Sequence, residues 1–341
     1  MQYKYTMTLR ATVIATCLLG SLLASCTGLD TRLPDIAAPD LAAETQFQET
    51  EALRKVESDA ATLLNAGWPV LTANAELCPK TRAAIGVKTH SLKSYSKRLR
   101  SGAKRVLGAD EHPRIFHIAD GSPAALAGFK RGDIILDDEN KPAKLSGDTW
   151  NSLLADNAIK VRRGSEEISL TVTPVLTCNY DLRLSNRAAI NAFADGRNII
   201  VTSGMMDFVQ SDNELALIIG HELAHNTMGH IRKVLSNYIV SFGGTRYTRP
   251  FESEADYVGL YYLVRAGYSP EGVESFWQRL ATKAPRGINR AKTHPTFPDR
   301  FLRIKAARKE IVIKQKTNAL LVPNFIPVSY THLTLPTKRI V

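Results

Sequence analysis

Three histidines and a glutamate stand in the apolar stretch IIGHELAHNTMGH, residues 218–230. His221 and His225 are four residues apart, so on a helix they would lie about 40° from each other on one face. Both imidazoles could then reach one ion, and Zn²⁺ favours such nitrogen ligands. Glu222 would project about 100° around the helix, where it could serve as general base for a metal-activated water. A set of satisfied core histidines is the alternative interpretation.

A catalytic zinc site needs a third protein ligand and one open position, whereas structural zinc sites are usually closed by four protein ligands. The stretch FESEADYVGLYYLVRAGY, residues 251–268, is expected to form the next helix and to supply that ligand. Glu252 and Asp256 share one helix face, so Asp256 could hold the other N–H of a ligand histidine. Glu254 points elsewhere and is the alternative ligand. We therefore expect one Zn²⁺ per chain.

HELAH, followed by ESEAD and a downstream THP, resembles metallopeptidase family 48, which includes the HtpX and CAAX prenyl proteases. The resemblance implies that Glu252 is the third zinc ligand. It also implies that His294, in THP, lies near the metal as an oxyanion stabiliser or a gate, supported by Arg300. A loop or helix-capping histidine is the alternative for His294. His230 would lie about 140° from His225 on a continuous helix, and it is interpreted as structural.

The residues around these motifs predict the elements that carry them. Ser211 to Glu214 forms a capping box at the start of the histidine helix. A turn at Asp195-Gly196 precedes the β-rich run 198–202, which the resemblance makes the edge strand that pairs with an extended substrate. The expected fold is α+β, with a mainly helical zincin-type (gluzincin) peptidase domain over residues 179–326.

A small β-rich module is expected before this domain, at residues 81–176. Its centre, GSPAALAGFKRGDIILDDENKP, resembles the PDZ domains of bacterial periplasmic proteases. That resemblance implies that Ile85-Gly86-Val87 receives the C-terminal carboxylate of a peptide ligand, since a glycine lets backbone N–H groups converge on an anion. A PDZ-shaped spacer without a ligand is the alternative. The module is expected to hold strands over 84–87, 114–118, 133–136 and 168–172 and a small helix over 122–127.

The first 25 residues are predicted to be a targeting segment. Lys4 and Arg10 give a positive start, and the apolar run 11–23 is too short for a comfortable membrane span. The following LASC resembles the bacterial lipoprotein signal, which implies lipidation of Cys26. The protein would then be anchored in the cell envelope and face the periplasm, and Thr27 favours the outer membrane. An ordinary signal peptide is the alternative.

Residues 26–80 are expected to hold a polar linker and then a packing helix from Asp40 to Asn65, ended by Gly67 and Pro69. The last residues, 327–341, resemble a translated sequencing adapter and are expected to be non-native.

Two cysteines flank the β-rich module. Because the periplasm is oxidising, Cys78 and Cys178 are expected to form a disulfide at its neck. Two buried free thiols are the alternative. Neither cysteine has an evident catalytic base nearby, which argues against cysteine-protease chemistry.

Composition narrows the function further. The 341 residues are 44% hydrophobic and 23% charged, which is typical of globular proteins, and the net charge is +11. This basic excess is spread along the chain and suits work near an anionic surface, while no nucleic-acid module is evident. The predicted function is a zinc endopeptidase of the bacterial envelope that cleaves misfolded or unassembled proteins in extended form. A PDZ-bearing chaperone or assembly factor with a gated, largely inactive metal site is the alternative.

Overall fold

The structure is a computed structural model that describes residues 33–144, 153–155, 157–233, 249–283 and 297–324. The expected signal segment with Cys26, the THP histidine His294 and the tail 327–341 lie outside these ranges. The chain divides into two compact units, Met1–Gln48 and Glu49–Val341. Within the described ranges, no helix has both the length and the apolar character needed to cross a bilayer.

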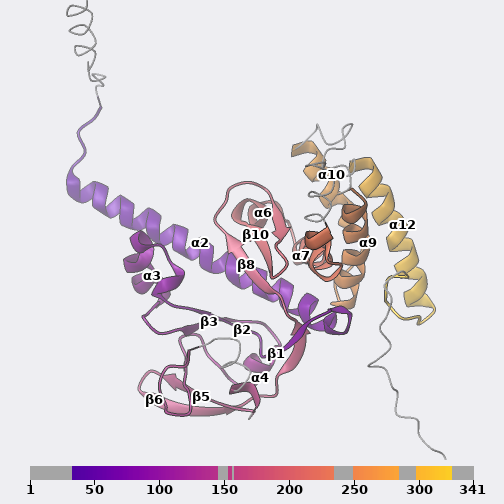
Figure 1. The fold of residues 1–341 in the computed structure, drawn as a ribbon. Coiled ribbons are helices and arrows are strands. Elements are labelled where there is room, and N and C mark those ends of the chain that lie inside the picture. The colour runs from indigo at the N-terminus through magenta and orange to yellow at the C-terminus, as the bar shows by residue number, and fades with distance from the viewer. Residues whose placement is uncertain (1–32, 145–152, 156, 234–248, 284–296, 325–341) are drawn as a thin grey trace, which may run out of the picture. The chain divides into compact units, whose positions relative to one another are not determined.

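The chain holds both helices and short strands, with strands β4 to β10 followed by helices α6 to α12 (Figure 1), in agreement with the predicted α+β class. The helices are α2 (Ala38–Ala73), η1 (Ala75–Leu77), η2 (Leu92–Ser94), η3 (Lys97–Leu99), α3 (Arg100–Leu107), α4 (Pro123–Leu126), α6 (Ser203–Phe208), α7 (Asp212–Thr227), α9 (Arg249–Arg265), α10 (Val273–Lys283) and α12 (Phe297–Lys316). The strands are β1 (Thr81–Ala84), β2 (Val87–His90), β3 (Arg114–Ile118), β4 (Ile134–Ile135), β5 (Ala158–Arg163), β6 (Glu166–Thr171), β7 (Val175–Cys178), β8 (Asp181–Ser185), β9 (Ala192–Ala194) and β10 (Asn198–Thr202).

Helix α2 is longer than its sequence indicates. The prediction that Gly67 and Pro69 end it is wrong, because the helix continues through both residues to Ala73. Its C-terminal half packs into the main hydrophobic core. A Cβ on Gly67 would lie 2.4 Å from Leu182 Cδ1, so a larger residue would have to displace the Leu182 side chain of β8. Tertiary packing here outweighs the poor helix propensity of glycine and proline.

The β-rich module has a hydrophobic core of its own, centred on Ile85, Ile115 and Ile159. Strand β3 covers the predicted 114–118, and Ser122 caps α4 by accepting a hydrogen bond from the Ala125 N–H. The strand expected over 84–87 is instead the corner between β1 and β2. Gly86 has φ +83° there, a left-handed conformation that interrupts a strand and favours glycine.

The neck of this module is a two-stranded ribbon closed by a disulfide. Strands β1 and β7 pair antiparallel, with Thr81 opposite Cys178. Cys178 is bonded to Cys78, just before β1, across a sequence separation of 100 residues. In the chain-entropy model a loop of that length stabilises the fold by up to about 4.7 kcal/mol, and 2–4 kcal/mol is typical. The bridge therefore fixes both ends of the module to the core that follows it.

A three-stranded sheet lies beside the histidine helix in the order β8-β10-β9. The expectation that 198–202 is an edge strand is wrong, since β10 lies between parallel β8 and antiparallel β9. The predicted turn at Asp195-Gly196 is present, and it closes a hairpin in which β9 covers one edge of β10. Strand β9 is thus the edge strand on that side of the sheet.

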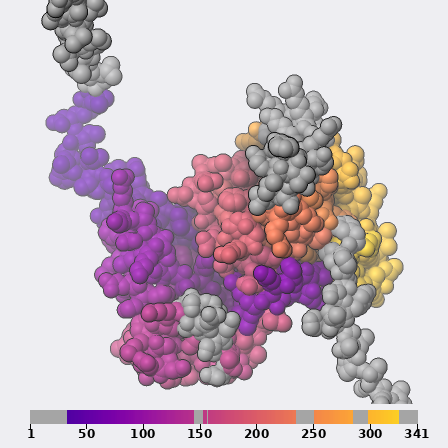
Figure 2. Space-filling model, viewed as in Figure 1, coloured from indigo at the N-terminus to yellow at the C-terminus, as the bar shows by residue number. Residues whose placement is uncertain are grey.

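Helices α7 and α9 cross at unusually close range. A Cβ on Gly220 would lie 2.7 Å from the Gly259 carbonyl oxygen, and a Cβ on Gly259 would lie 2.8 Å from the His221 Cα. The two glycines therefore allow the backbones to touch where any side chain would hold them apart. Helix α12 packs against α9 and α10, and its yellow atoms lie against the orange helices in Figure 2.

Candidate metal centre

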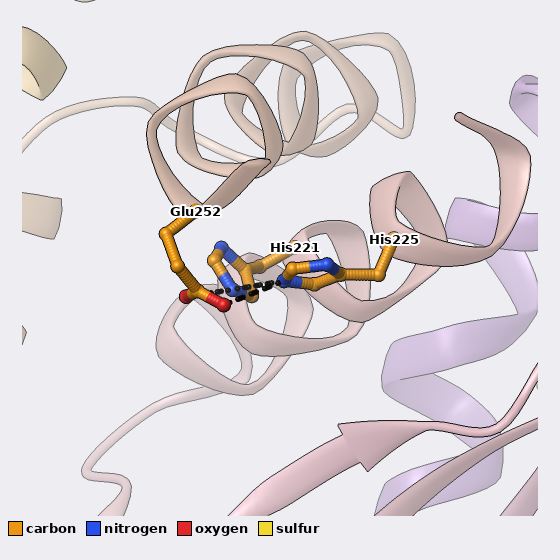
Figure 3. A group of neighbouring side chains, drawn as sticks. All are labelled: His221, His225 and Glu252. Carbon is orange, nitrogen blue, oxygen red and sulfur yellow. Dashed lines mark hydrogen bonds and ion pairs between the residues drawn. The ribbon is translucent and has the colours of Figure 1, made fainter. Parts of the chain in front are cut away.

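Helix α7 positions the two histidines of the centre. Its start is confirmed by Ser211, whose side chain accepts a hydrogen bond from the Glu214 N–H. From there the helix continues to Thr227, which places His221 and His225 on adjacent turns of one face. Their rings lie 4.8 Å apart at 72°, with both Nε2 atoms directed toward Glu252 (Figure 3).

Three ligand atoms converge at this point. The two Nε2 atoms are 3.1 Å apart, and they lie 3.6 Å (His221) and 3.5 Å (His225) from the carboxylate oxygens of Glu252. Bonds of about 2.0–2.2 Å in a tetrahedron place neighbouring ligand atoms about 3.3–3.6 Å apart. The donor set and its spacing therefore fit a tetrahedral divalent cation with three protein ligands.

The electrostatics of the two histidines also fit a cation. Burial alone would lower the pKa of His221, but the carboxylates of Asp256 and Glu252 raise it to about 10. Burial, together with positive charge on His221, lowers the pKa of His225 to about 3. Positive charge is thus strongly stabilised at the centre, while His225 stays a neutral lone-pair donor.

Glu222 lies beside the ligands without joining them. It is 8% exposed, and burial, followed by the neighbouring Glu252 carboxylate, raises its pKa to about 7. The backbone N–H of Ala194 in β9 hydrogen-bonds to it. A buried carboxyl group with a pKa near neutrality can both accept and release a proton at physiological pH.

Asp256 connects the centre to helix α12. Its Oδ1 atom lies 2.9 Å from His221 Nδ1, so this carboxylate faces the ring nitrogen opposite the ligand atom. Arg300 donates to both Asp256 oxygens, at 2.8 and 2.6 Å, and its guanidinium stacks 3.6 Å over the Trp277 ring. Burial alone would raise the pKa of Asp256, but Arg300 and His221 hold it below its usual value.

Glu254 and His230 lie on the other side of His225. Glu254, the alternative ligand from the sequence, instead contacts His230 Nε2 at 2.7 Å. The helix ends at Thr227, and Gly229, with φ +67°, turns the chain back toward His225. The expectation that His230 lies about 140° around a continuous helix is therefore wrong, and its ring comes into contact with His225.

The structure thus brings together His221, Glu222, His225, Glu252, Asp256 and Arg300, while His294 lies outside the described residues. Sequence reasoning missed Asn226. Its side chain accepts from the Gly196 N–H at 2.8 Å and donates to the Asn198 carbonyl at 3.1 Å, which fastens the β9–β10 hairpin to α7. The available signal in the sequence was an asparagine directly after the second motif histidine, and the structure leaves this side chain only 7% exposed.

The segment that carries this centre is similar in sequence to known metallopeptidases. The sequence model of Peptidase family M48 matches residues 162–244 and 235–311. Mitochondrial metalloendopeptidase OMA1 of Schizosaccharomyces pombe is 23% identical over 224 residues, which cover 54% of this chain and 66% of that protein.

Two relatives from Escherichia coli (strain K12) are also similar to the chain. The beta-barrel assembly-enhancing protease is 25% identical over 136 residues, covering 30% of this chain and 28% of the relative. Metalloprotease LoiP is 28% identical over 146 residues, covering 34% and 58%. The chain thus spans no more than 66% of the length of these three relatives. The family model thus matches the segment of this chain, residues 162–311, in which His221, His225 and Glu252 converge.

Proposed function

We propose that this chain is a zinc-dependent endopeptidase of the bacterial cell envelope that cleaves misfolded or unassembled proteins. The observation that carries the proposal is the spacing of 3.1–3.6 Å among the Nε2 atoms of His221 and His225 and the Glu252 carboxylate. Two imidazoles and one carboxylate leave a fourth tetrahedral position open, as catalytic zinc sites require.

A bound zinc ion supplies Lewis acidity, which polarises a peptide carbonyl and lowers the pKa of water. The chain's own residues do the rest. Glu222 takes the proton from the attacking water at its carboxylate and delivers it to the leaving amine. Asp256 keeps the His221 ring oriented, and Arg300 holds Asp256. His294 is assigned to oxyanion stabilisation or gating on the family resemblance.

The substrate is proposed to bind as an added strand on β9. This strand is the sheet edge beside the centre, and its Ala194 N–H already bonds to Glu222. An extended peptide paired with β9 would lie along the ligand atoms, with its carbonyl groups facing Glu222. Folded proteins offer few extended segments, so this mode of binding favours unfolded or unassembled chains.

Location is proposed from the sequence and the relatives. Lipidation of Cys26 would anchor the protein in the envelope, facing the periplasm and most simply at the outer membrane. The names of two relatives indicate different cellular locations. One is called a beta-barrel assembly-enhancing protease, and the other is a mitochondrial metalloendopeptidase. The signal segment and the disulfide Cys78–Cys178 favour an oxidising bacterial compartment.

Metal removal tests the proposed chemistry directly. Purified protein should carry one zinc per chain by elemental mass spectrometry and should hydrolyse an unfolded protein such as reduced casein. Dialysis against a chelator should abolish hydrolysis, and one equivalent of Zn²⁺ should restore it. Protein without stoichiometric metal, or hydrolysis that survives complete metal removal, would contradict the proposal.

A second candidate role, binding of a peptide C-terminus by the β-rich module, is favoured by a cavity of about 480 Å³. Trp68, Gly86 and Leu182 are among the residues that line it. Lys88 also lines it and donates to the Leu182 carbonyl at 3.1 Å, and burial of its ammonium group lowers its pKa. Apolar walls beside a partly desolvated cation suit an apolar side chain next to a carboxylate.

Peptide binding tests this second role. A fluorescent peptide with a free C-terminus should bind to the full chain about 10-fold more tightly than its amidated form, because one charge-assisted hydrogen bond is lost. Lys88→Met should remove that preference, whereas Lys93→Met, on exposed η2 outside the cavity, should keep it. Equal affinity for both peptides would leave the module as a spacer.

A further inference from the structure

A chain of three side chains leads away from one ligand of the metal centre. His225 directs Nε2 toward the ligand cluster, and its Nδ1 lies 3.1 Å from the Nδ1 of His230. The other nitrogen of His230, Nε2, lies 2.7 Å from Glu254 Oε2. His230 is fully buried, and the Phe251 ring stacks on it at 4.8 Å and 22°. The imidazole is therefore fixed in position from two sides.

The hydrogen-bonding capacity of these groups fixes where the protons lie. An ionised carboxylate only accepts, so Glu254 accepts a hydrogen bond from the Nε2–H of His230. A neutral His230 then has a lone pair on Nδ1, and that nitrogen can only accept. His225 must donate its Nδ1–H to it, which leaves the Nε2 lone pair of His225 directed toward Glu252 and His221. The opposite tautomer of His225 would place a proton where a metal ligand needs a lone pair.

We propose that His230 and Glu254 are positioning residues that hold His225 in the tautomer and ring orientation required for metal binding. Asp256 faces Nδ1 of His221 in the same way, so each ligand histidine has a partner on its outer nitrogen. Glu252, Glu254 and Asp256 all belong to the first turns of α9. One short segment of α9 therefore supplies the ligand Glu252 and two further carboxylates. Asp256 is the acceptor for His221, and Glu254 is the acceptor for His225 through His230.

The test uses the full chain and three variants, with zinc affinity measured by competition with a chromophoric chelator. Loss of such an outer partner typically weakens metal binding about 10- to 100-fold, and we expect that loss in His230→Ala. His230→Asn keeps an amide oxygen near the position of Nδ1 and should recover most of the affinity. His90→Ala is the matched control, because His90 is a buried histidine of the β-rich module whose Nδ1 bonds to Tyr95. Its zinc affinity should equal that of the unchanged chain.

Unchanged zinc affinity in His230→Ala, or equal affinities in the Ala and Asn variants, would overturn the proposal. A purely packing role would lower thermal stability in both variants alike without separating their metal affinities. The cobalt-substituted protein gives a second readout, since a reoriented His225 should change its visible absorption spectrum.

The inference rests on the proposed metallopeptidase function, yet the two can fail separately. Nitrogen-15 chemical shifts of the His225 ring in metal-free protein report its tautomer without turnover. We expect the Nδ1–H tautomer in the unchanged chain and a mixture of tautomers in His230→Ala. A protein with this tautomer that cleaves nothing would refute the proposed function alone. An active protein in which His230→Ala leaves the His225 tautomer unchanged would refute the positioning role alone.

Discussion

Replacing Glu222 with glutamine should lower kcat/KM for peptide hydrolysis about 100- to 10,000-fold while zinc content stays at one per chain. Glutamine has the same shape but cannot take a proton from water. The carboxyl group of Glu222 lies outside the set of converging ligand atoms, so its loss should leave the metal in place. Kinetics with a fluorogenic unfolded substrate and elemental analysis of the same sample measure both quantities.

A matched control separates the loss of a base from the loss of a buried carboxylate. Glu274 on α10 is also 8% exposed, but it pairs with Arg308 at 3.1 Å, outside the ligand set. Glu274→Gln should therefore keep nearly full activity. If Glu222→Gln still processed unfolded envelope proteins at the unchanged rate, the chain would act by binding, as a chaperone or assembly factor, and its metal site would be a gated or structural feature.

Local periodicity was enough to predict part of the candidate site. The spacing of His221 and His225 follows from 3.6 residues per turn, and Ser211 caps the helix where it was predicted to begin, although the Glu214 carboxylate accepts from the Gln210 N–H and so does not complete a capping box. The choice of Glu252 over Glu254 came from shared helix faces and a family resemblance. Both carboxylates lie on α9, and only the observed crossing of α7 and α9 shows which of them faces the histidines.

The remaining features depend on contacts between distant segments, which periodicity does not encode. Gly220 and Gly259 look like ordinary helix-weakening residues in the sequence, yet they set the close approach of the two helices. Gly67 signals a helix end by propensity, but packing against β8 keeps it helical. His230 was misplaced because a single positive φ at Gly229 redirects the chain. The PDZ resemblance of residues 81–176 stays a prediction.

Arg300→Met should lower the free energy of unfolding by about 3–5 kcal/mol, because it takes the guanidinium from the buried Asp256 carboxylate and leaves only His221 beside that charge. Arg300 and Asp256 are 5% and 3% exposed and share two hydrogen bonds, so solvent cannot replace the lost partner. Zinc affinity should fall as well, since Asp256 also orients His221. Urea unfolding of the metal-free protein and chelator competition measure the two effects separately.

Helix α12 itself offers the control for this prediction. Arg303, one turn away, pairs with Asp299 at 3.0 Å, but the two side chains are 59% and 43% exposed. Surface pairs of this kind contribute about 0–1 kcal/mol, so Arg303→Met should change stability little. Adding Asp256→Asn to Arg300→Met removes the uncompensated charge and should recover part of the lost stability. Equal costs for the two arginine variants would mean that the buried pair does not join α9 to α12, and that the orientation of His221 rests on other contacts of the centre.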